Sequence, residues 1–155
     1  MSVADRLAEL GLTLPPVATP VAAYVPAVRH GDLVHTSGQL PMVDGALALT
    51  GKVGESAGSV TPEQAKDAAR TCALNALAAV AAEVGGLEQV VRVVKVTGFV
   101  ASEPSFTGQP GVVNGASELL GEIFGDAGRH ARSAVGVAAL PLDAPVEVEI
   151  VVAVR

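Results

Sequence analysis

The carboxyl-terminal quarter of the chain carries the pattern that most constrains its fold. Residues 130–140 and 145–154 are rich in alanine and β-branched residues, and a Leu-Pro-Leu-Asp-Ala-Pro turn joins them. Both stretches therefore read as strands. In the second, strict alternation puts three aliphatic side chains on one face and two carboxylates on the other, namely Val146, Val148 and Ile150 against Glu147 and Glu149.

An arginine lies near the start of the first strand, and a glutamate lies near the start of the second. Arg132 and Glu147 meet if the two strands pair. One interpretation is a site for a carboxylate ligand, because the planar guanidinium carries a fork of donors that matches a carboxylate. The other is an ordinary surface ion pair between these two residues, which stabilises a protein little. Spacing alone leaves both open.

Composition indicates one globular domain. Of the 155 residues 50% are hydrophobic and 17% are charged, which is enough apolar surface for a sizeable core. Only 3% are aromatic, so alanine, valine and leucine have to do the packing. Small side chains bury little area each, and burial between the subunits of an oligomer adds to stability. The net charge of −6, without a basic stripe, argues against a nucleic-acid partner.

Several other classes of protein find no support in the sequence. The single Cys72 excludes an internal disulfide and fits a reducing compartment. The histidines are His30, His35 and His130, which lack the spacing of zinc ligands, so we expect no metal site. No apolar run reaches membrane-spanning length, and the acidic amino terminus is unlike a signal peptide. We therefore expect a cytoplasmic protein with no membrane partner.

The chain is expected to begin with an appendage. Ser2 is a candidate N-cap and Gly11 a stop for a short helix over residues 2–10. We divide the chain into an amino-terminal appendage, residues 1–19, and a domain, residues 20–155.

The domain is expected to open with a hairpin. Residues 21–28 and 33–37 read as two strands around a turn at 29–32. Residues 42–58 follow as a long glycine-rich loop with a short strand over 46–49, and a loop of this length is often functional.

Two helices and a strand come next. Thr61 and Gln64 form a capping box, so a helix is expected from Pro62 to about Val84, where a Gly-Gly pair ends it. Residues 90–101 read as a central strand, and residues 112–124 as a second helix. Cys72 lies on the apolar stripe of the first helix, as a core residue rather than a nucleophile.

This order predicts the fold class. Strand, strand, helix, strand, helix, strand, strand (ββαβαββ) makes an α+β two-layer sandwich, with one sheet and two helices on one of its faces. The other face then has to be polar or be buried against another subunit.

Motifs at both ends of the domain resemble one known family, the RidA/YjgF family, also called the endoribonuclease L-PSP family. The segment 24–28 with the Thr-Ser-Gly-Gln-Leu-Pro of residues 36–41 resembles its amino-terminal hairpin. The Ala-Arg-Ser of residues 131–133, with Leu-Pro at 140–141 and Val-Glu-Val-Glu at 146–149, resembles its carboxyl-terminal signature. The resemblance covers about residues 20–155.

The resemblance implies a fold, an assembly and a reaction. Members of this family have a chorismate-mutase-like fold with a mixed sheet, and form homotrimers with ligand clefts between subunits. The best-known members hydrolyse reactive 2-imino or enamine acids to 2-oxo acids and ammonia, without a cofactor. Arg132 matches the arginine that binds the substrate carboxylate, and Glu147 the glutamate that positions the attacking water. The residues that match the lining of the cleft are Tyr24, Ser37, Gly38 and Asn114.

The sequence also departs from the family pattern. Ala134 stands where the deaminases often have cysteine, which excludes thiol chemistry there. His130 stands where the family often has proline, and is either a structural hydrogen-bonding residue or a proton donor near the cleft. The amino-terminal helix and the long central loop are additions to the compact pattern. A divergent subgroup with its own substrate is the expectation.

Three functions remain open. The first is an imine or enamine deaminase. The second is a non-catalytic trimer that binds a small carboxylate. The third is the ribonuclease of the family name, against which the acidic charge balance argues.

Overall fold

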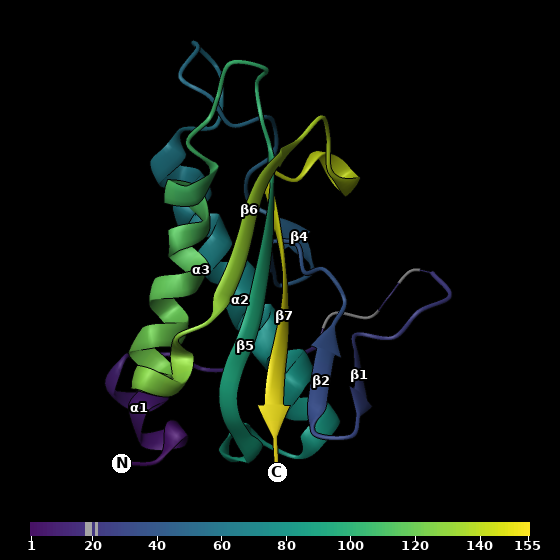
Figure 1. The fold of residues 1–155 in the computed structure, drawn as a ribbon. Coiled ribbons are helices and arrows are strands. Elements are labelled where there is room, and N and C mark those ends of the chain that lie inside the picture. Colours follow the sequence, from purple (N-terminus) through teal and green to yellow (C-terminus); the bar gives the residue numbers. More distant parts are fainter. Residues whose placement is uncertain (18–19, 21) are drawn as a thin grey trace.

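The computed structural model describes residues 1–17, 20 and 22–155, and this described part has two layers (Figure 1). One layer is a five-stranded sheet in the order β1-β2-β7-β5-β6. The other is a pair of long helices that cover one face of the sheet. The elements are β1 (Ala27–His30), β2 (Leu33–Thr36), β5 (Val90–Ala101), β6 (Ala131–Val137), β7 (Val146–Val154), α2 (Pro62–Val84) and α3 (Gln109–Phe124). The expected α+β two-layer sandwich is confirmed.

The two carboxyl-terminal strands do not pair with each other. β5 lies between them, parallel to β6 and antiparallel to β7, so the sheet is mixed. α3 connects β5 to β6, and a strand–helix–strand unit of this kind brings its two strands side by side in parallel. β7 then takes the other side of β5. The expectation that Arg132 and Glu147 meet across neighbouring strands is therefore wrong.

α2 begins and ends at its predicted signals. The Thr61 hydroxyl accepts from the backbone N–H of Gln64, whose side chain accepts from the Thr61 N–H at 3.0 Å. Gly85 ends the helix in a left-handed conformation, with φ at +83°. The predicted helix is confirmed.

α3 begins earlier than predicted. It starts at Gln109 rather than at Val112, and Pro110 sits in its first turn. Proline is favourable there because the first turn leaves backbone N–H groups without partners anyway. Gly108 offers no side-chain cap, so the sequence lacked the signal that marked α2.

The short helix α1 (Val3–Glu9) forms as predicted and packs on the domain. The Ser2 side chain caps it. Arg6 Nε donates to the backbone carbonyl of Glu122 in α3 at 2.7 Å, and Leu7 packs against the core. The expected end of the appendage at Thr19 lies outside the described residues.

The first strand is shorter than predicted. Val21, its expected start, lies outside the described residues, and β1 begins only after Pro26, which has no N–H to give to a neighbouring strand. β1 continues to His30, so the turn shrinks to two residues, in which Gly31 takes a φ of +61°.

The long loop contains a second, two-stranded sheet. β3 (Met42–Val43) pairs with β4 (Ala46–Leu47) around Asp44 and Gly45, whose φ angles are 52° and 80°. The short strand expected over residues 46–49 is present over its first two residues, and its partner was missed.

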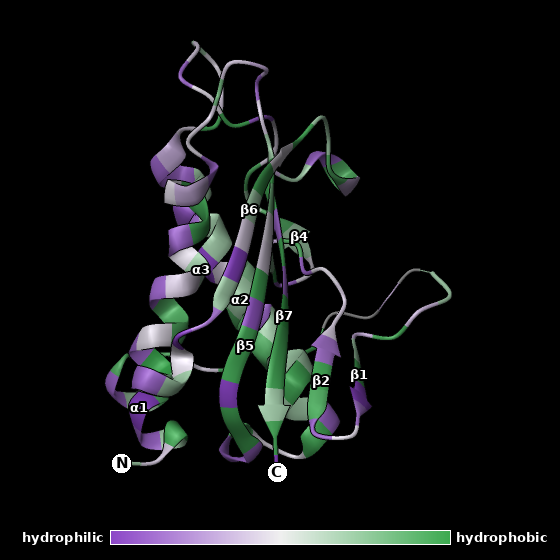
Figure 2. Ribbon diagram, in the orientation of Figure 1, coloured by the Kyte–Doolittle hydropathy of each residue, from purple (hydrophilic) through white to green (hydrophobic). Residues whose placement is uncertain are grey.

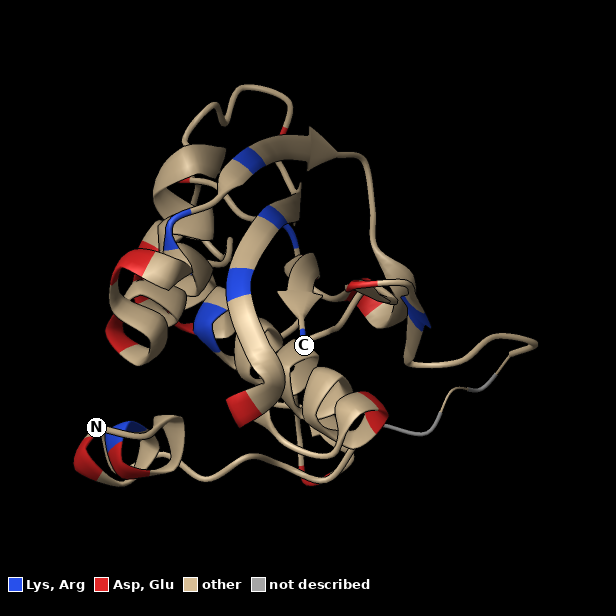
Figure 3. Cartoon of the chain, turned by 60° about the horizontal axis from the view of Figure 1, so that its bottom comes forward, with Lys and Arg blue, Asp and Glu red and all other residues tan. Residues whose placement is uncertain are grey.

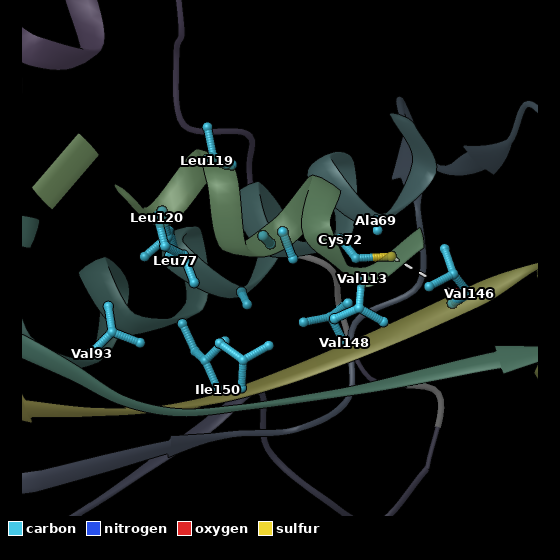
Figure 4. Packing of buried hydrophobic residues seen from close by; sticks show 14 of the residues in the cluster. Ala69, Cys72, Leu77, Val93, Val113, Leu119, Leu120, Val146, Val148 and Ile150 are labelled. Atoms are coloured by element: carbon cyan, nitrogen blue, oxygen red, sulfur yellow. Dashed lines mark hydrogen bonds between the residues drawn. The ribbon is translucent and has the colours of Figure 1, made fainter. Parts of the chain in front are cut away.

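The core lies between the sheet and the two long helices (Figure 4). Every second residue of β7 from Val146 to Val154 is buried, as the alternation predicted. Cys72 is fully buried and its thiol lies 3.7 Å from the carbonyl oxygen of Val146, which confirms it as a core residue. Burial raises the pKa of this thiol, so it is a poor nucleophile. Close packing of α2 on α3 depends on Gly115, whose added Cβ would overlap the backbone carbonyl of Lys66.

No helix of the described residues covers the other face of the sheet (Figure 1). The residues that alternate with the core positions face this side, and they mix apolar and charged side chains. They include Leu33, Lys95, Phe99, Val135, Glu147, Glu149 and Val151. Figure 2 shows hydrophobic positions along most of the length of these strands. A half-apolar face of this kind is suited to burial against a second protein surface.

Candidate functional site

Arg132 lies on the side of β6 that faces α3, and polar groups of α3 hold its guanidinium. Its Nη1 donates to Asn114 Oδ1 at 2.7 Å and to Ser117 Oγ at 3.2 Å. Its Nη2 donates to the backbone carbonyl of Pro110 at 3.3 Å. The structure thus brings together two predicted site residues, Arg132 and Asn114.

The positive charge of Arg132 has no carboxylate partner in the described part of the chain. The ion pairs there join other residues, and Glu147 is in none of them. Neutral acceptors fix the direction of the guanidinium but leave its charge uncompensated. A partly buried arginine in this state is suited to bind an anion from outside the chain.

His130 is hydrogen-bonded at both ring nitrogens. Its Nδ1 lies 2.6 Å from the carbonyl oxygen of Gly128, and its Nε2 lies 2.9 Å from Ser117 Oγ. Of the two roles considered for this residue, the geometry supports the structural one. Proton donation by His130 stays a prediction.

Glu147 lies on β7, on the sheet face opposite to Arg132. Its carboxylate packs directly over Gly38, where an added Cβ would overlap Oε1. A two-way backbone bridge between Gln39 and Val148, at 2.8 and 3.0 Å, holds this segment against β7. The need for glycine here is one of space, because Gly38 is not among the glycines with positive φ.

Burial and charge repulsion act on the Glu147 carboxyl together. Its half-buried position raises the pKa above the ordinary value for glutamate, and the Glu149 carboxylate adds to the rise. A carboxyl with a raised pKa is suited to exchange a proton with a reactant near neutral pH.

Ser37 directly precedes Gly38, and hydrogen bonds connect it to the loop that contains Tyr24. The Ser37 hydroxyl donates to the carbonyl of Val25 at 2.6 Å, and the Ser37 N–H donates to that of Pro26 at 2.8 Å. These bonds tie the Tyr24 loop to the end of β2, next to Gly38. Tyr24 itself is 52% exposed.

The predicted site residues therefore form two separate groups. The Arg132 group contains Arg132 and Asn114, and the Glu147 group contains Tyr24, Ser37, Gly38 and Glu147. Arg132 is level with Val96 on β5 and Glu147 is level with Phe99, so two strand spacings and three residues separate them. This amounts to about 14 Å between Cα atoms, and the odd offset turns the side chains to opposite faces. Within one chain these residues form neither an ion pair nor a common site.

Sequence reasoning missed Ser117. It lies three residues after Asn114, and residues three apart share a face of a helix. A hydroxyl one turn beyond a predicted site residue was the available signal.

No group of three His, Cys, Asp or Glu side chains within residues 1–17, 20 and 22–155 is placed to hold a metal ion. None of the helices in these ranges is both long and apolar enough to cross a membrane.

Comparison with known proteins gives consistent matches along the chain. The family model described as "YjgF/chorismate mutase-like, putative endoribonuclease" matches residues 4–153, which includes most of α1. Protein TCP17 of Trypanosoma cruzi is 48% identical over 151 residues, which cover 97% of this chain and 92% of that protein.

Solved structures agree. The crystal structure of a "putative endoribonuclease" from Shewanella oneidensis has a TM-score of 0.93 at 32% identity, over 99% of this chain and all of the other. Escherichia coli TdcF, solved with bound serine, has a TM-score of 0.63 at 26% identity, over 92% and 94% of the two chains. The expected chorismate-mutase-like fold is confirmed.

Proposed function

The chain belongs to the YjgF/chorismate mutase-like family, and on that premise we propose that it hydrolyses reactive 2-imino or enamine acids to 2-oxo acids and ammonia. The observation that carries the proposal is Arg132, a fixed guanidinium without a carboxylate partner in the described residues. Its role in the proposal is to bind the carboxylate of the substrate. TdcF, a relative with bound serine, supports a small carboxylic acid as the class of ligand.

Glu147 has the second role in the proposal. An enamine acid first takes a proton at C3 and loses one from nitrogen to become the 2-imino acid. Water then adds its oxygen to C2 while one of its protons passes to the imine nitrogen, and the resulting hydroxyl gives its proton to the same nitrogen as the C–N bond breaks, which leaves the 2-oxo acid and ammonia. Glu147 positions this water, accepts one of its protons and passes that proton to the nitrogen, and its raised pKa favours this transfer. Ala134 supplies no thiol, so the proposed reaction proceeds without a covalent intermediate at that position.

We propose further that the site forms between copies of the chain in a homotrimer. A small substrate is much shorter than the distance between Arg132 and Glu147 within one chain. One copy therefore contributes its Arg132 group and a neighbour contributes its Glu147 group. The half-apolar open face of the sheet supports such an assembly. A cytoplasmic location remains part of the proposal.

The test is ammonia release from freshly generated 2-iminobutyrate or 2-aminoacrylate. The wild-type chain is expected to accelerate it, and Arg132→Ala is expected to abolish the acceleration. Arg29→Ala is the matched control, since Arg29 donates to the backbone carbonyls of Gly31 and Arg155 at the far edge of the sheet. Equal, negligible rates in wild type and Arg132→Ala would refute deamination of these substrates.

A protein that binds a carboxylate without catalysis is the second candidate. It is favoured because Asn114 and Ser117 hold the Arg132 guanidinium without any contribution from Glu147. It predicts a rise in Tm on addition of 2-oxobutyrate, lost in Arg132→Ala, with no ammonia release. The endoribonuclease in the family description is tested with the same variant, because RNA cleavage that survives Arg132→Ala would indicate a contaminant. Figure 3 shows both Lys or Arg and Asp or Glu positions along the ribbon, and the net charge of −6 argues against RNA as a ligand.

A further inference from the structure

The hydrogen bonds around Arg132 have defined directions. The carbonyl of Gly128 only accepts, so His130 Nδ1 carries the hydrogen of that 2.6 Å contact. In the neutral imidazole Nε2 is then an acceptor, and the Ser117 hydroxyl donates to it across 2.9 Å. The Ser117 lone pairs are left to accept from Arg132 Nη1. A chain of three bonds thus runs from the Gly128 carbonyl to the guanidinium.

These hydrogen bonds determine which edge of the Arg132 guanidinium is available to a ligand. Nη1 has two hydrogens, and Asn114 and Ser117 take both. Nη2 gives one of its two hydrogens to Pro110, and Nε has no acceptor among the described residues. The donors left for a ligand are therefore on Nε and Nη2, which are neighbours on one edge of the guanidinium.

We infer that Ser117 and His130 are positioning residues, which hold the Nη1 edge of Arg132 so that its Nε–Nη2 edge receives the substrate carboxylate. Ser117 acts on Arg132 directly, and His130 acts by orienting the Ser117 hydroxyl. This inference rests on the proposed function for the identity of the ligand, and it assigns the direction from which that ligand approaches.

Substitutions at Ser117 test the first step. Ser117→Ala removes one acceptor of Nη1, so the guanidinium rotates more freely and carboxylate binding weakens about five- to tenfold. The effect falls on KM and much less on kcat, because the carboxylate is bound equally in ground and transition states. Ser117→Thr keeps the hydroxyl and restores binding. The control is Thr71→Val, which removes a hydroxyl that donates within α2, to the Asp67 carbonyl.

Substitutions at His130 test the second step. His130→Leu removes the acceptor of the Ser117 hydroxyl, and binding weakens about threefold, whereas His130→Gln keeps a polar group in its place and changes little. Because His130 acts only through Ser117, the double variant Ser117→Ala/His130→Leu binds no more weakly than Ser117→Ala. Additive losses of binding in the double variant would show that His130 does not act through Ser117.

A measurement without any ligand separates this inference from the proposed function. The rotation rate of the Arg132 guanidinium is read from its side-chain NMR signals in the free protein, assigned by their loss in Arg132→Lys. Ser117→Ala is expected to speed rotation several-fold, and Ser117→Thr to leave it slow. Faster rotation in Ser117→Ala, together with no ammonia release by the wild-type protein from 2-iminobutyrate or 2-aminoacrylate, supports the positioning role and refutes the proposed function. Unchanged rotation and binding in Ser117→Ala, with binding lost in Arg132→Ala, overturns the inference and leaves the proposed function standing.

Discussion

At the scale of single residues, Glu147 has its carboxylate where burial and a neighbouring charge both oppose ionisation. Its pKa is raised in the folded protein, so the fold holds this proton more tightly than the unfolded chain does. Folding stability therefore falls as the pH rises from the unfolded pKa, about 4.3, to the higher folded value, and the loss persists at neutral pH. Below the unfolded pKa both states are protonated and the loss disappears.

Glu147→Gln is accordingly expected to stabilise the protein at pH 7 and to have no effect at about pH 3. The gain is a few tenths of a kcal/mol, because a half-exposed carboxyl is well screened by solvent. Thermal unfolding at both pH values measures it. Glu149→Gln removes only the second cause of the rise and should give a smaller gain. A Glu147→Gln variant that is less stable at pH 7 alone would show that the carboxylate has a favourable partner.

Gly38 leaves room for the same carboxylate. Gly38→Ala pushes the flexible end of Glu147 aside and leaves the backbone in place, so Tm is expected to change little. The rate of ammonia release is expected to fall about 10- to 100-fold, because a displacement of about 1 Å disrupts a positioned catalytic group. Gly121→Ala, which adds a methyl group in open space, is the control. An unchanged rate would remove Glu147 from the proposed mechanism.

How much of the candidate site was readable from the sequence differs from residue to residue. Arg132 and Asn114 were named because their types and positions match a family signature, and the structure brings them into contact. The expected meeting of Arg132 with Glu147 failed, because neighbours along the chain need not be neighbours in a sheet. Ser117 was missed because a serine inside a helix carries no signal of its own until its partners are known.

At the scale of elements, the close approach of α2 and α3 determines where Asn114 and Ser117 lie. Gly115 lies between them and faces the backbone of Lys66. Gly115→Ala sets a methyl group against a carbonyl that cannot move without its helix, and about 1–3 kcal/mol of unfolding free energy is expected to be lost. Chemical denaturation measures this loss. Gly121→Ala on the same helix should instead stabilise by about 0.5–1 kcal/mol, because alanine favours a helix more than glycine does. Equal effects at the two positions would contradict close packing at Gly115.

Elements with strong end signals were predictable, and those without were not. α2 has a capping box and a left-handed glycine, and its expected bounds are correct. The expected bounds of β1, residues 21–28, are wrong because its pairing with β2 starts after Pro26 and continues to a turn of only two residues. The β3–β4 hairpin was half missed because a two-residue strand is too short to show any periodicity.

At the scale of the whole molecule, the order of strands and helices along the chain predicted a sheet face without helices, while the order of strands in the sheet came only from the structure. With β5 between β6 and β7, the Arg132 and Glu147 groups lie on opposite faces. If Arg132 and Glu147 both act on one small substrate, they have to come from different copies of the chain. The proposed site therefore predicts an oligomer. The expected mass in solution is three times the 15.5 kDa of one chain, measured by light scattering. A monomer would contradict the proposed site.

A sharper form of this prediction uses two inactive variants. Arg132→Ala keeps an intact Glu147 group, and Glu147→Gln keeps an intact Arg132 group. If each site takes one group from each of two neighbouring copies, co-expressed mixed trimers contain sites in which both groups are intact. For random assembly of equal amounts, about a quarter of the sites have this composition, so about a quarter of the wild-type rate is expected to return. Each variant alone should be inactive. A mixture as inactive as its components would contradict a site shared between copies. Because the two groups lie about 14 Å apart on opposite faces of one sheet, it would also show that they do not act together on one small substrate.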